Sequence, residues 1–392
     1  MVSKLFLHLV LGLLVLAGGI NATEPPSLPA NITDRANMSG MNMAGMNMSG
    51  MHMNQSDLRF ANLSRANLKD AYLKSAWLND ADLTDADLTN ADLTGAFLDN
   101  ADLQRSDLTG SILVNAKISK TKLNNARLIK ADLTNADLSD SDLSDSDLTD
   151  ARLFRADLSG SKLRGMYLFG ANLIGAHVSW ADLSEAFLSR AQLSRAELYS
   201  TNLNHADLNG ADFTRAYLMR CNLTGAILDS ASMAYADLTE ADLSDARLLR
   251  AGLQYADLTR SDLSGADLSD AKMDSIRLVS AKMRNAKLDR VMLRQIDLRG
   301  VDLKEASLKG SSLDIVYLTG ANLSGANLEN SQLTQVELTG ANLKQANLKG
   351  IIYDQFTLYS LAKADLVGAI MSDKLKSDLQ LLDAGASPET DR

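Results

Sequence analysis

A five-residue period runs without a slip through residues 56–350 of this chain. It makes 59 consecutive words, and the third residue of 53 of them is Leu. Ala81-Asp82-Leu83-Thr84-Asp85 is a typical word, with a small residue first and a polar residue second. A short fixed period constrains the fold more than any other feature, because each unit must bury its apolar face against copies of itself. Most residues therefore serve the scaffold.

The spacing inside each word predicts a very short strand followed by a corner. The first and third residues lie two apart, so they point to the same side of an extended segment. The fourth and fifth residues are mostly Ser, Thr, Lys, Asp, Asn or Gly, which favour turns. Gly recurs at the fifth position, as at Gly95 and Gly110, where a turn can require a positive φ. An α-helix is excluded, because a five-residue period leaves no continuous apolar stripe on it.

This pattern resembles the pentapeptide-repeat family over about three quarters of the chain. The resemblance implies an all-β fold, a right-handed quadrilateral β-helix with one word on each side and four words in each coil. It also implies that the small residue and the Leu both point inward. In that family the motif specifies the fold and not the function.

A four-sided coil predicts that residues twenty apart stack in one column. Bulky residues at the first position follow this spacing, at Ile276, Ile296, Val316 and Val336, with Phe356 next. Charges do so too, since Asp102, Lys122 and Asp142 alternate in sign. Opposite charges on neighbouring strands stabilise their pairing. We expect the four aliphatic residues to form one inward column.

Four segments are predicted along the chain. Residues 1–22 read as a secretory signal peptide, since Lys4 precedes an apolar run at 5–17 and small residues follow. Residues 23–55 form a Pro-containing leader with a Met-rich segment, and residues 56–350 form the β-helix. Residues 351–392 form a cap and tail, helical where Leu375, Leu379 and Leu382 recur. We therefore expect an exported protein, periplasmic or extracellular, with no membrane span after cleavage; an uncleaved anchor is the alternative.

Charge and cysteine content narrow the function classes. The net charge of −10 argues against a nucleic-acid partner held through its phosphates. Cys221 is the only cysteine, which excludes a disulfide framework. It stands at a small, inward position and is predicted to be a buried, inert thiol. The acidic stretch at 132–150 is predicted to be a solvated outer face.

The Met-rich segment offers a candidate metal site. Thioether sulfur is a soft ligand that suits Cu(I), and His52 would make the affinity fall as pH drops through about 6.5. Two other interpretations stay open: worn-down first coils with Met in the core, or a flexible leader. The bulk of Met at three first positions argues against the coils. The candidate ligands are Met38, Met41, Met43, Met46, Met48, Met51, His52 and Met53.

Three functions follow from these observations. The first is an exported, non-enzymatic β-helical scaffold that presents surfaces to a protein partner. The second is a soft-metal protein that binds copper or silver through the Met-rich segment, with Cu(I) as the one cofactor considered. The third comes from the family resemblance: an acidic mimic of DNA that inhibits a type II topoisomerase. The signal peptide and the basic stretch at 272–309 do not fit that third function. No catalytic constellation stands out against the repeat.

Overall fold

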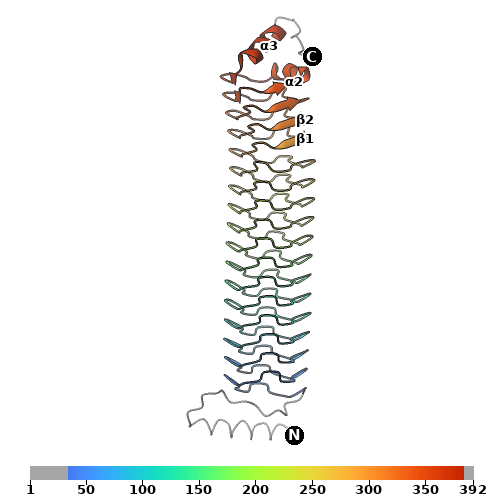
Figure 1. Ribbon diagram of the computed structural model, residues 1–392, viewed down its shortest axis with the longest axis vertical. Coiled ribbons are helices and arrows are strands. Elements are labelled where there is room, and N and C mark those ends of the chain that lie inside the picture. Colours follow the sequence, from blue (N-terminus) through green and yellow to red (C-terminus); the bar gives the residue numbers. More distant parts are fainter. Residues whose placement is uncertain (1–33, 384–392) are drawn as a thin grey trace. The chain divides into compact units, whose positions relative to one another are not determined.

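The computed structural model describes residues 34–383, so the predicted signal peptide and the start of the leader lie outside the described residues. The chain divides into two compact units, Met1–Ala181 and Asp182–Arg392. Within each unit the backbone winds into stacked coils of twenty residues (Figure 1). This confirms the four-sided β-helix. Among the described residues, no helix has the length and apolar character needed to cross a bilayer.

Second-position residues pair in parallel with residues twenty positions away. Asp82 pairs with Asn62 on one side and with Asp102 on the other. The predicted charge column forms as well, because Lys122 pairs with both Asp102 and Asp142. The Lys122 ammonium lies 3.1 Å from the Asp102 carboxylate. These registers confirm the twenty-residue coil.

The word at 81–85 shows how the backbone N–H groups are satisfied when Asp stands at the second position. The N–H groups of Asp82 and Leu83 donate to carbonyls of the coils on either side, at 3.0 and 2.7 Å, and that of Asp85 donates to the next coil at 3.0 Å. The Ala86 N–H closes the corner by donating to the Leu83 carbonyl at 3.1 Å. The Thr84 N–H donates to the Asp82 side chain at 3.0 Å. In this word the N–H of the fourth residue does not pair with a carbonyl of a neighbouring coil. Asp or Asn is frequent at the second position because its side-chain oxygen accepts a hydrogen bond from this N–H.

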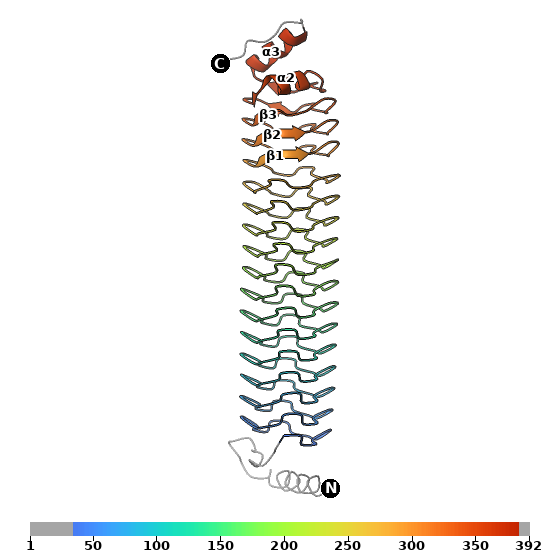
Figure 2. The same cartoon turned by 90° about the vertical axis from the view of Figure 1, so that its right-hand side faces the viewer.

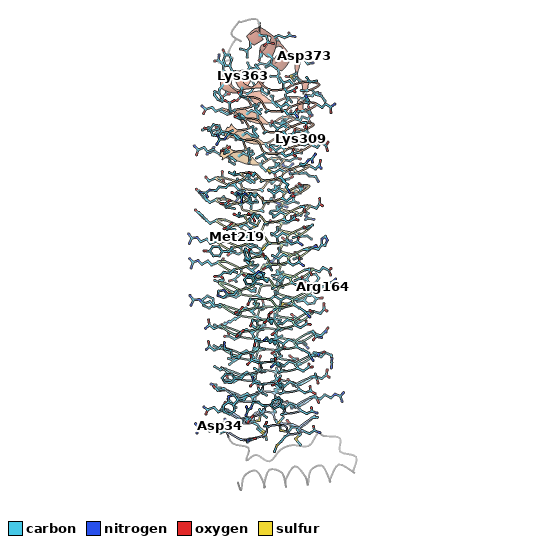
Figure 3. The ribbon with its side chains drawn as sticks, turned by 180° about the vertical axis from the view of Figure 1, so that it is seen from behind. Asp34, Arg164, Met219, Lys309, Lys363 and Asp373 are labelled. Carbon is cyan, nitrogen blue, oxygen red and sulfur yellow. The ribbon has the colours of Figure 1, made fainter. Side chains whose placement is uncertain are left out.

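Corners place the fifth residue of nearly every word in the left-handed region, with φ between +52° and +74°. That conformation costs an L-residue about 1 kcal/mol, and Gly, Asn and Asp tolerate it best. Fourth-position residues point away from the core. Arg164 in one unit and Lys309 in the other are exposed at such corners (Figure 3).

The core consists of third-position side chains with small first-position residues between them. In residues 76–95, Leu78, Leu83, Leu88 and Leu93 are all fully buried. In the second unit Phe213 is the largest fully buried side chain. Dry, close-packed apolar contact therefore stabilises each coil against the next.

Among residues 34–383, strands longer than a single bridge occur only in the second unit. β1 (Met292–Asp297), β2 (Ser312–Tyr317), β3 (Gln332–Thr334) and β5 (Ile352–Tyr353) form one parallel sheet in that order (Figure 2). Ile296 pairs with Val316 across β1 and β2. Ile276, Ile296, Val316 and Val336 are all buried, which confirms the predicted inward column.

A helical cap closes the second unit. α2 (Gln355–Leu361) follows β5, and its Thr357 and Ser360 hydroxyls accept hydrogen bonds from the backbone N–H groups of Val336 and Leu338. These N–H groups belong to the edge of the last coil, so the helix shields an edge that would otherwise be open to pairing. Phe356 belongs to α2 and is 49% exposed, so the prediction that it extends the aliphatic column is wrong.

The rest of the cap contains the predicted helix. β4 (Asn347–Leu348) pairs with β6 (Ile370–Met371), and α3 (Asp373–Asp383) follows. Leu375 of α3 is buried, whereas Leu379 and Leu382 are half-buried. The Tyr353 hydroxyl donates to the Asp378 carboxylate at 2.5 Å and ties α3 to β5. Helical spacing therefore identified α3, whereas α2 carries only one buried apolar pair at helical spacing, Leu358 and Leu361, and was not predicted.

Pairing starts one coil earlier than the predicted boundary at residue 56. Asn37 pairs with Asp57, and Asn42 pairs with Asn62. The Met38 N–H donates to the Asp57 carbonyl at 2.7 Å. Residues 36–55 therefore form a complete coil, in which Met stands where later words have Leu or Ala.

Candidate functional site

Four methionines occupy the core positions of the coil at residues 36–55. Each lies at the third position of its word, one on each side of the coil, and each is fully buried: Met38, Met43, Met48 and Met53. Their backbone N–H groups donate to the next coil at 2.7–2.8 Å. The side chains thus take the place that Leu takes in the coil at 56–75.

Three further methionines stand at the first positions of the same coil. Met46 is 5% exposed, while Met41 and Met51 are half-buried. The coil keeps its register, since the carbonyls of all three accept N–H groups from the next coil at 2.9 Å. The expectation that Met at these positions distorts the coil is wrong. Met166 shows the reason, because it is fully buried at a first position farther along the same unit.

His52 does not join these methionines. It stands at a second position, which points away from the core, and its side chain is exposed. Its ring stacks on that of Tyr72, with centroids 4.4 Å apart and planes 9° apart. The structure therefore places seven of the eight predicted ligands at inward positions of one coil and the eighth on the outer face of the same coil.

Hard-metal ligands are not grouped in the same way. Among residues 34–383, no cluster of three or more His, Cys, Asp or Glu side chains is arranged to hold a metal ion. Acids of the stretch at 132–150 have structural partners instead. Asp137 lies 3.2 Å from the Lys117 ammonium, and its Oδ1 accepts hydrogen bonds from Ser139. Burial alone would raise the pKa of Asp137, but these hydrogen bonds and the ion pair lower it below its usual value.

Pairing of acidic with basic side chains argues against the third function, an acidic mimic of DNA. A protein that mimics the phosphate backbone needs rows of uncompensated negative charge. Here basic side chains lie beside acidic side chains of the neighbouring coil. Lys122 lies 3.1 Å from Asp102, and Arg152 lies 3.7 Å from Asp132. The acidic columns of the first unit are thus partly neutralised.

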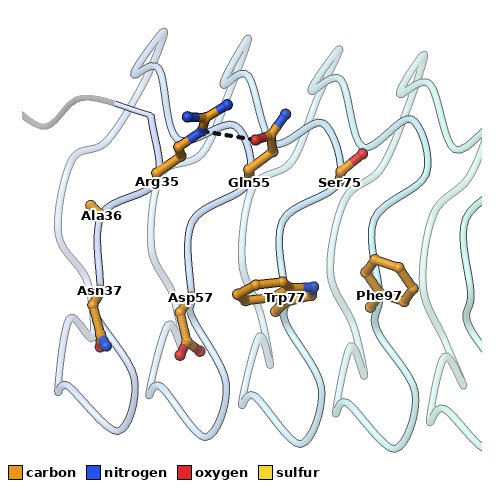
Figure 4. Close-up of a pocket in the computed structure, with 8 residues that line it drawn as sticks. All are labelled: Arg35, Ala36, Asn37, Gln55, Asp57, Ser75, Trp77 and Phe97. Atoms are coloured by element: carbon orange, nitrogen blue, oxygen red, sulfur yellow. Dashed lines mark hydrogen bonds between the residues drawn. The ribbon is translucent and has the colours of Figure 1, made fainter.

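An open groove of about 600 Å³ lies on the outer surface of the first coils. Figure 4 shows the two columns that line it. One column consists of the corner residues Arg35, Gln55 and Ser75, and the other consists of the second-position residues Asn37, Asp57, Trp77 and Phe97. We call this the aromatic groove; its lining residues are Arg35, Ala36, Asn37, Gln55, Asp57, Ser75, Trp77 and Phe97.

Aromatic and charged groups meet in the aromatic groove. Trp77 and Phe97 are 44% and 37% exposed and pair as neighbours in their column. The Arg59 guanidinium lies 5.6 Å from the centroid of the Trp77 ring and holds the Asp57 carboxylate through two hydrogen bonds of 2.8 and 2.9 Å. These hydrogen bonds and the charge of Asp57 raise the pKa of Arg59 above its ordinary value. This cation–π pair lies on the outer surface beside the groove, and it is not part of the core.

Sequence reasoning missed the groove as a site. Trp77 and Phe97 are visible as outward aromatics twenty residues apart, but Arg35 and Gln55 come from the adjoining corner column. The Arg35 Nε donates to Gln55 Oε1 at 2.9 Å along that column. Writing the sequence in rows of twenty residues would have placed the two columns side by side.

Cys221 carries no site chemistry. Its thiol is buried and donates to the Leu198 carbonyl at 2.8 Å. Burial raises the pKa of the Cys221 thiol to about 12, so the reactive thiolate is scarce at neutral pH. The prediction that this thiol is buried is confirmed, and the raised pKa agrees with an inert role.

Comparison with known proteins gives a family match along both units. The model of the family described as "Pentapeptide repeats" matches residues 34–70, 66–105, 111–150, 151–190, 179–215, 216–250, 231–270, 241–278, 281–314 and 316–350. No curated protein matches the chain.

Solved structures of pentapeptide repeat proteins also match. Rfr23 from the cyanobacterium Cyanothece 51142 is 33% identical, and the match covers 30% of this chain and 64% of Rfr23, with a TM-score of 0.20. HetL from the cyanobacterium Nostoc sp. strain PCC 7120, involved in heterocyst differentiation regulation, is 30% identical over 68% of this chain and 95% of HetL, with a TM-score of 0.17. QnrB1, a plasmid-mediated fluoroquinolone resistance protein, is 16% identical over 63% of this chain and 97% of its own, with a TM-score of 0.23. The low TM-scores add nothing to the evidence of the repeat itself.

Proposed function

The chain belongs to the pentapeptide-repeat family, and from this premise we propose that it is an exported, non-enzymatic scaffold whose aromatic groove binds a protein partner. The observation that carries the proposal is the exposed pair Trp77 and Phe97 beside the Arg59 guanidinium. Trp and Arg are enriched among the residues that dominate protein interfaces. A word needs neither of them for folding, because Asp or Asn at the second position already satisfies the corner.

The chemistry of the groove supports binding and not catalysis. Its one carboxylate, Asp57, is held by Arg59 through two hydrogen bonds. A general base must be free to accept a proton from a substrate, and an ion-paired carboxylate is poorly suited to that role. The arrangement favours recognition by stacking and by a positioned guanidinium.

Substituting the groove aromatics by the consensus residue tests this proposal. We expect a photo-crosslinking amino acid at Gln55, which lines the groove, to give a discrete adduct with a partner protein in the producing cells. Replacing Trp77 and Phe97 by Asn should abolish that adduct, because the stacking surface is lost while Asn supplies the corner hydrogen bond of the usual word. Adduct formation is read by mass shift on a denaturing gel.

The matched control removes a different aromatic pair. Tyr235 and Tyr255 of the second unit stack with centroids 4.8 Å apart. Both occupy fifth positions with positive φ, which Asn tolerates, so replacing both by Asn removes similar surface without strain. The adduct should survive in this control. Loss in both variants, or in neither, would contradict a role for the groove.

Export is tested by fractionation. The proposal rests on residues 1–22, with Lys4, an apolar run and small residues near the expected cleavage point. We expect the full chain to give a shorter mature form outside the cytoplasm, with an N-terminus near Ile20 or Thr23. Removing residues 1–22 should retain the protein in the cytoplasm. An unprocessed chain in the cytoplasmic fraction would contradict export.

A further inference from the structure

We propose that the coil at residues 36–55 binds a soft monovalent metal ion, Cu(I) or Ag(I), through its inward thioethers. This inference is independent of the protein-binding proposal, since it uses the inner face of the coil and not the outer groove. We call the seven inward methionines the thioether layer; they are Met38, Met41, Met43, Met46, Met48, Met51 and Met53.

The coil at residues 36–55 is richer in inward methionine than any other coil among residues 34–350. Elsewhere in the β-helix Met appears singly among the inward positions, at Met166, Met233, Met273 and Met283. Leu at the third position and Ala or another small residue at the first fill the core in the other coils. The coil at residues 36–55, with Met at all four third positions and at three of its four first positions, therefore concentrates sulfur that the other described coils lack.

Ligand chemistry selects the ion. Thioether sulfur is soft and polarizable, and it suits Cu(I) and Ag(I), whereas Zn(II), Mg(II) and Ca(II) prefer harder or charged donors. The layer is also uncharged, so it offers no compensation for a second positive charge. Because the cost of burying an ion rises steeply with its charge, a monovalent ion is favoured over a divalent one.

The layer has a route for an ion. Met41 and Met51 are half-buried, whereas the residues at the same positions of the next coil, Ala61 and Ala71, are buried. Met has three rotatable bonds and adapts its shape easily, so buried sulfurs can turn toward an ion that enters past the half-buried ones. Such sites often complete their geometry only on binding.

The position of His52 changes the pH dependence that we expect for the Ag(I) affinity. A ligand set with an imidazole would lose affinity as pH falls through about 6.5. His52 lies outside and stacks on Tyr72, so the thioether layer contains no titratable ligand. We therefore expect Ag(I) affinity to be the same between about pH 5.5 and 8, and His52→Ala to leave it unchanged.

Consensus substitution provides the test. In the first variant, Leu replaces the four third-position methionines and Ala replaces the three first-position ones, as in the consensus word. Calorimetric titration of the purified full chain with Ag(I) should show saturable binding, and this variant should lose it. Zn(II), Mg(II) and Ca(II) should give no heat of binding to either protein, and circular dichroism should show the same fold in both.

A second variant controls for sulfur content in general. Met233, Met273 and Met283 are buried third-position residues of the other unit, and replacing all three by Leu should leave Ag(I) binding intact. Should the sevenfold variant fail to fold, the pair Met41→Ala and Met51→Ala, at the half-buried positions, should still weaken Ag(I) binding. Absence of binding by the unmodified chain, or binding retained by either layer variant, would overturn the proposal.

Discussion

Replacing Leu243 by Asp should destabilise the second unit by several kcal/mol, the largest effect expected from a single change in this chain. Leu243 is fully buried at a third position, and its backbone N–H donates to the next coil at 2.7 Å. A carboxylate placed there would face a dry, apolar core without a partner. The free energy of unfolding, obtained from chemical denaturation followed by circular dichroism, measures the loss.

Asp242 is the matched control, one residue away and exposed. From the sequence alone, Asp242→Ala is expected to change stability by less than about 0.5 kcal/mol. The structure revises this value upward, because the Asp242 carboxylate accepts hydrogen bonds from the Ser244 N–H and hydroxyl at 2.9 and 2.6 Å. Losing this corner bond should cost about 1 kcal/mol. Equal losses at Asp242 and Leu243 would refute the assignment of inside and outside.

The second large effect is expected at Phe213, the largest fully buried side chain. Phe213→Ala should cost about 3–5 kcal/mol, because the close-packed coils on either side cannot collapse into the cavity. Phe213→Leu restores the residue found at this position in most words and should cost less than about 1.5 kcal/mol. Both are measured by the denaturation midpoint.

A small effect of Phe213→Ala would mean that the coils relax around a missing ring. The core would then be more plastic than its burial indicates. Because repeat proteins unfold in segments, the comparison should use probes in the second unit, such as the exposed Tyr217.

Most of the fold could be predicted from the sequence because its period maps directly onto contacts. Once four words make one coil, twenty residues separate stacked neighbours, and Ile296 must pair with Val316. The same arithmetic placed Cys221 inside the core. Local turn chemistry was also readable, since Gly at the fifth position signalled the positive φ that the corners adopt.

The five-residue period does not predict which residues can replace Leu and Ala in the core, or how the end of the β-helix is capped. Met38 and Met41 keep the register of the repeat without its usual residues, so the first coil read as a leader. α2 buries Thr357 and Ser360, whose hydroxyls bind an open strand edge, and hydroxyl residues carry no apolar period. Burial of Met38 does not distinguish packing from metal ligation, because both roles place the side chain inside the coil.

The fixed pairing between residues twenty positions apart has a consequence for how such a gene can change. Each second-position residue pairs with the residue twenty away, as Asp82 does with Asp102, and each corner closes on its own word. An insertion of one residue destroys a corner, and an insertion of one word turns everything beyond it by a quarter of a revolution. The aromatic groove, built from columns on adjoining sides, would be taken apart by such a shift. An insertion that keeps the columns of a unit in their original alignment must therefore be a whole coil, which is twenty residues or sixty nucleotides.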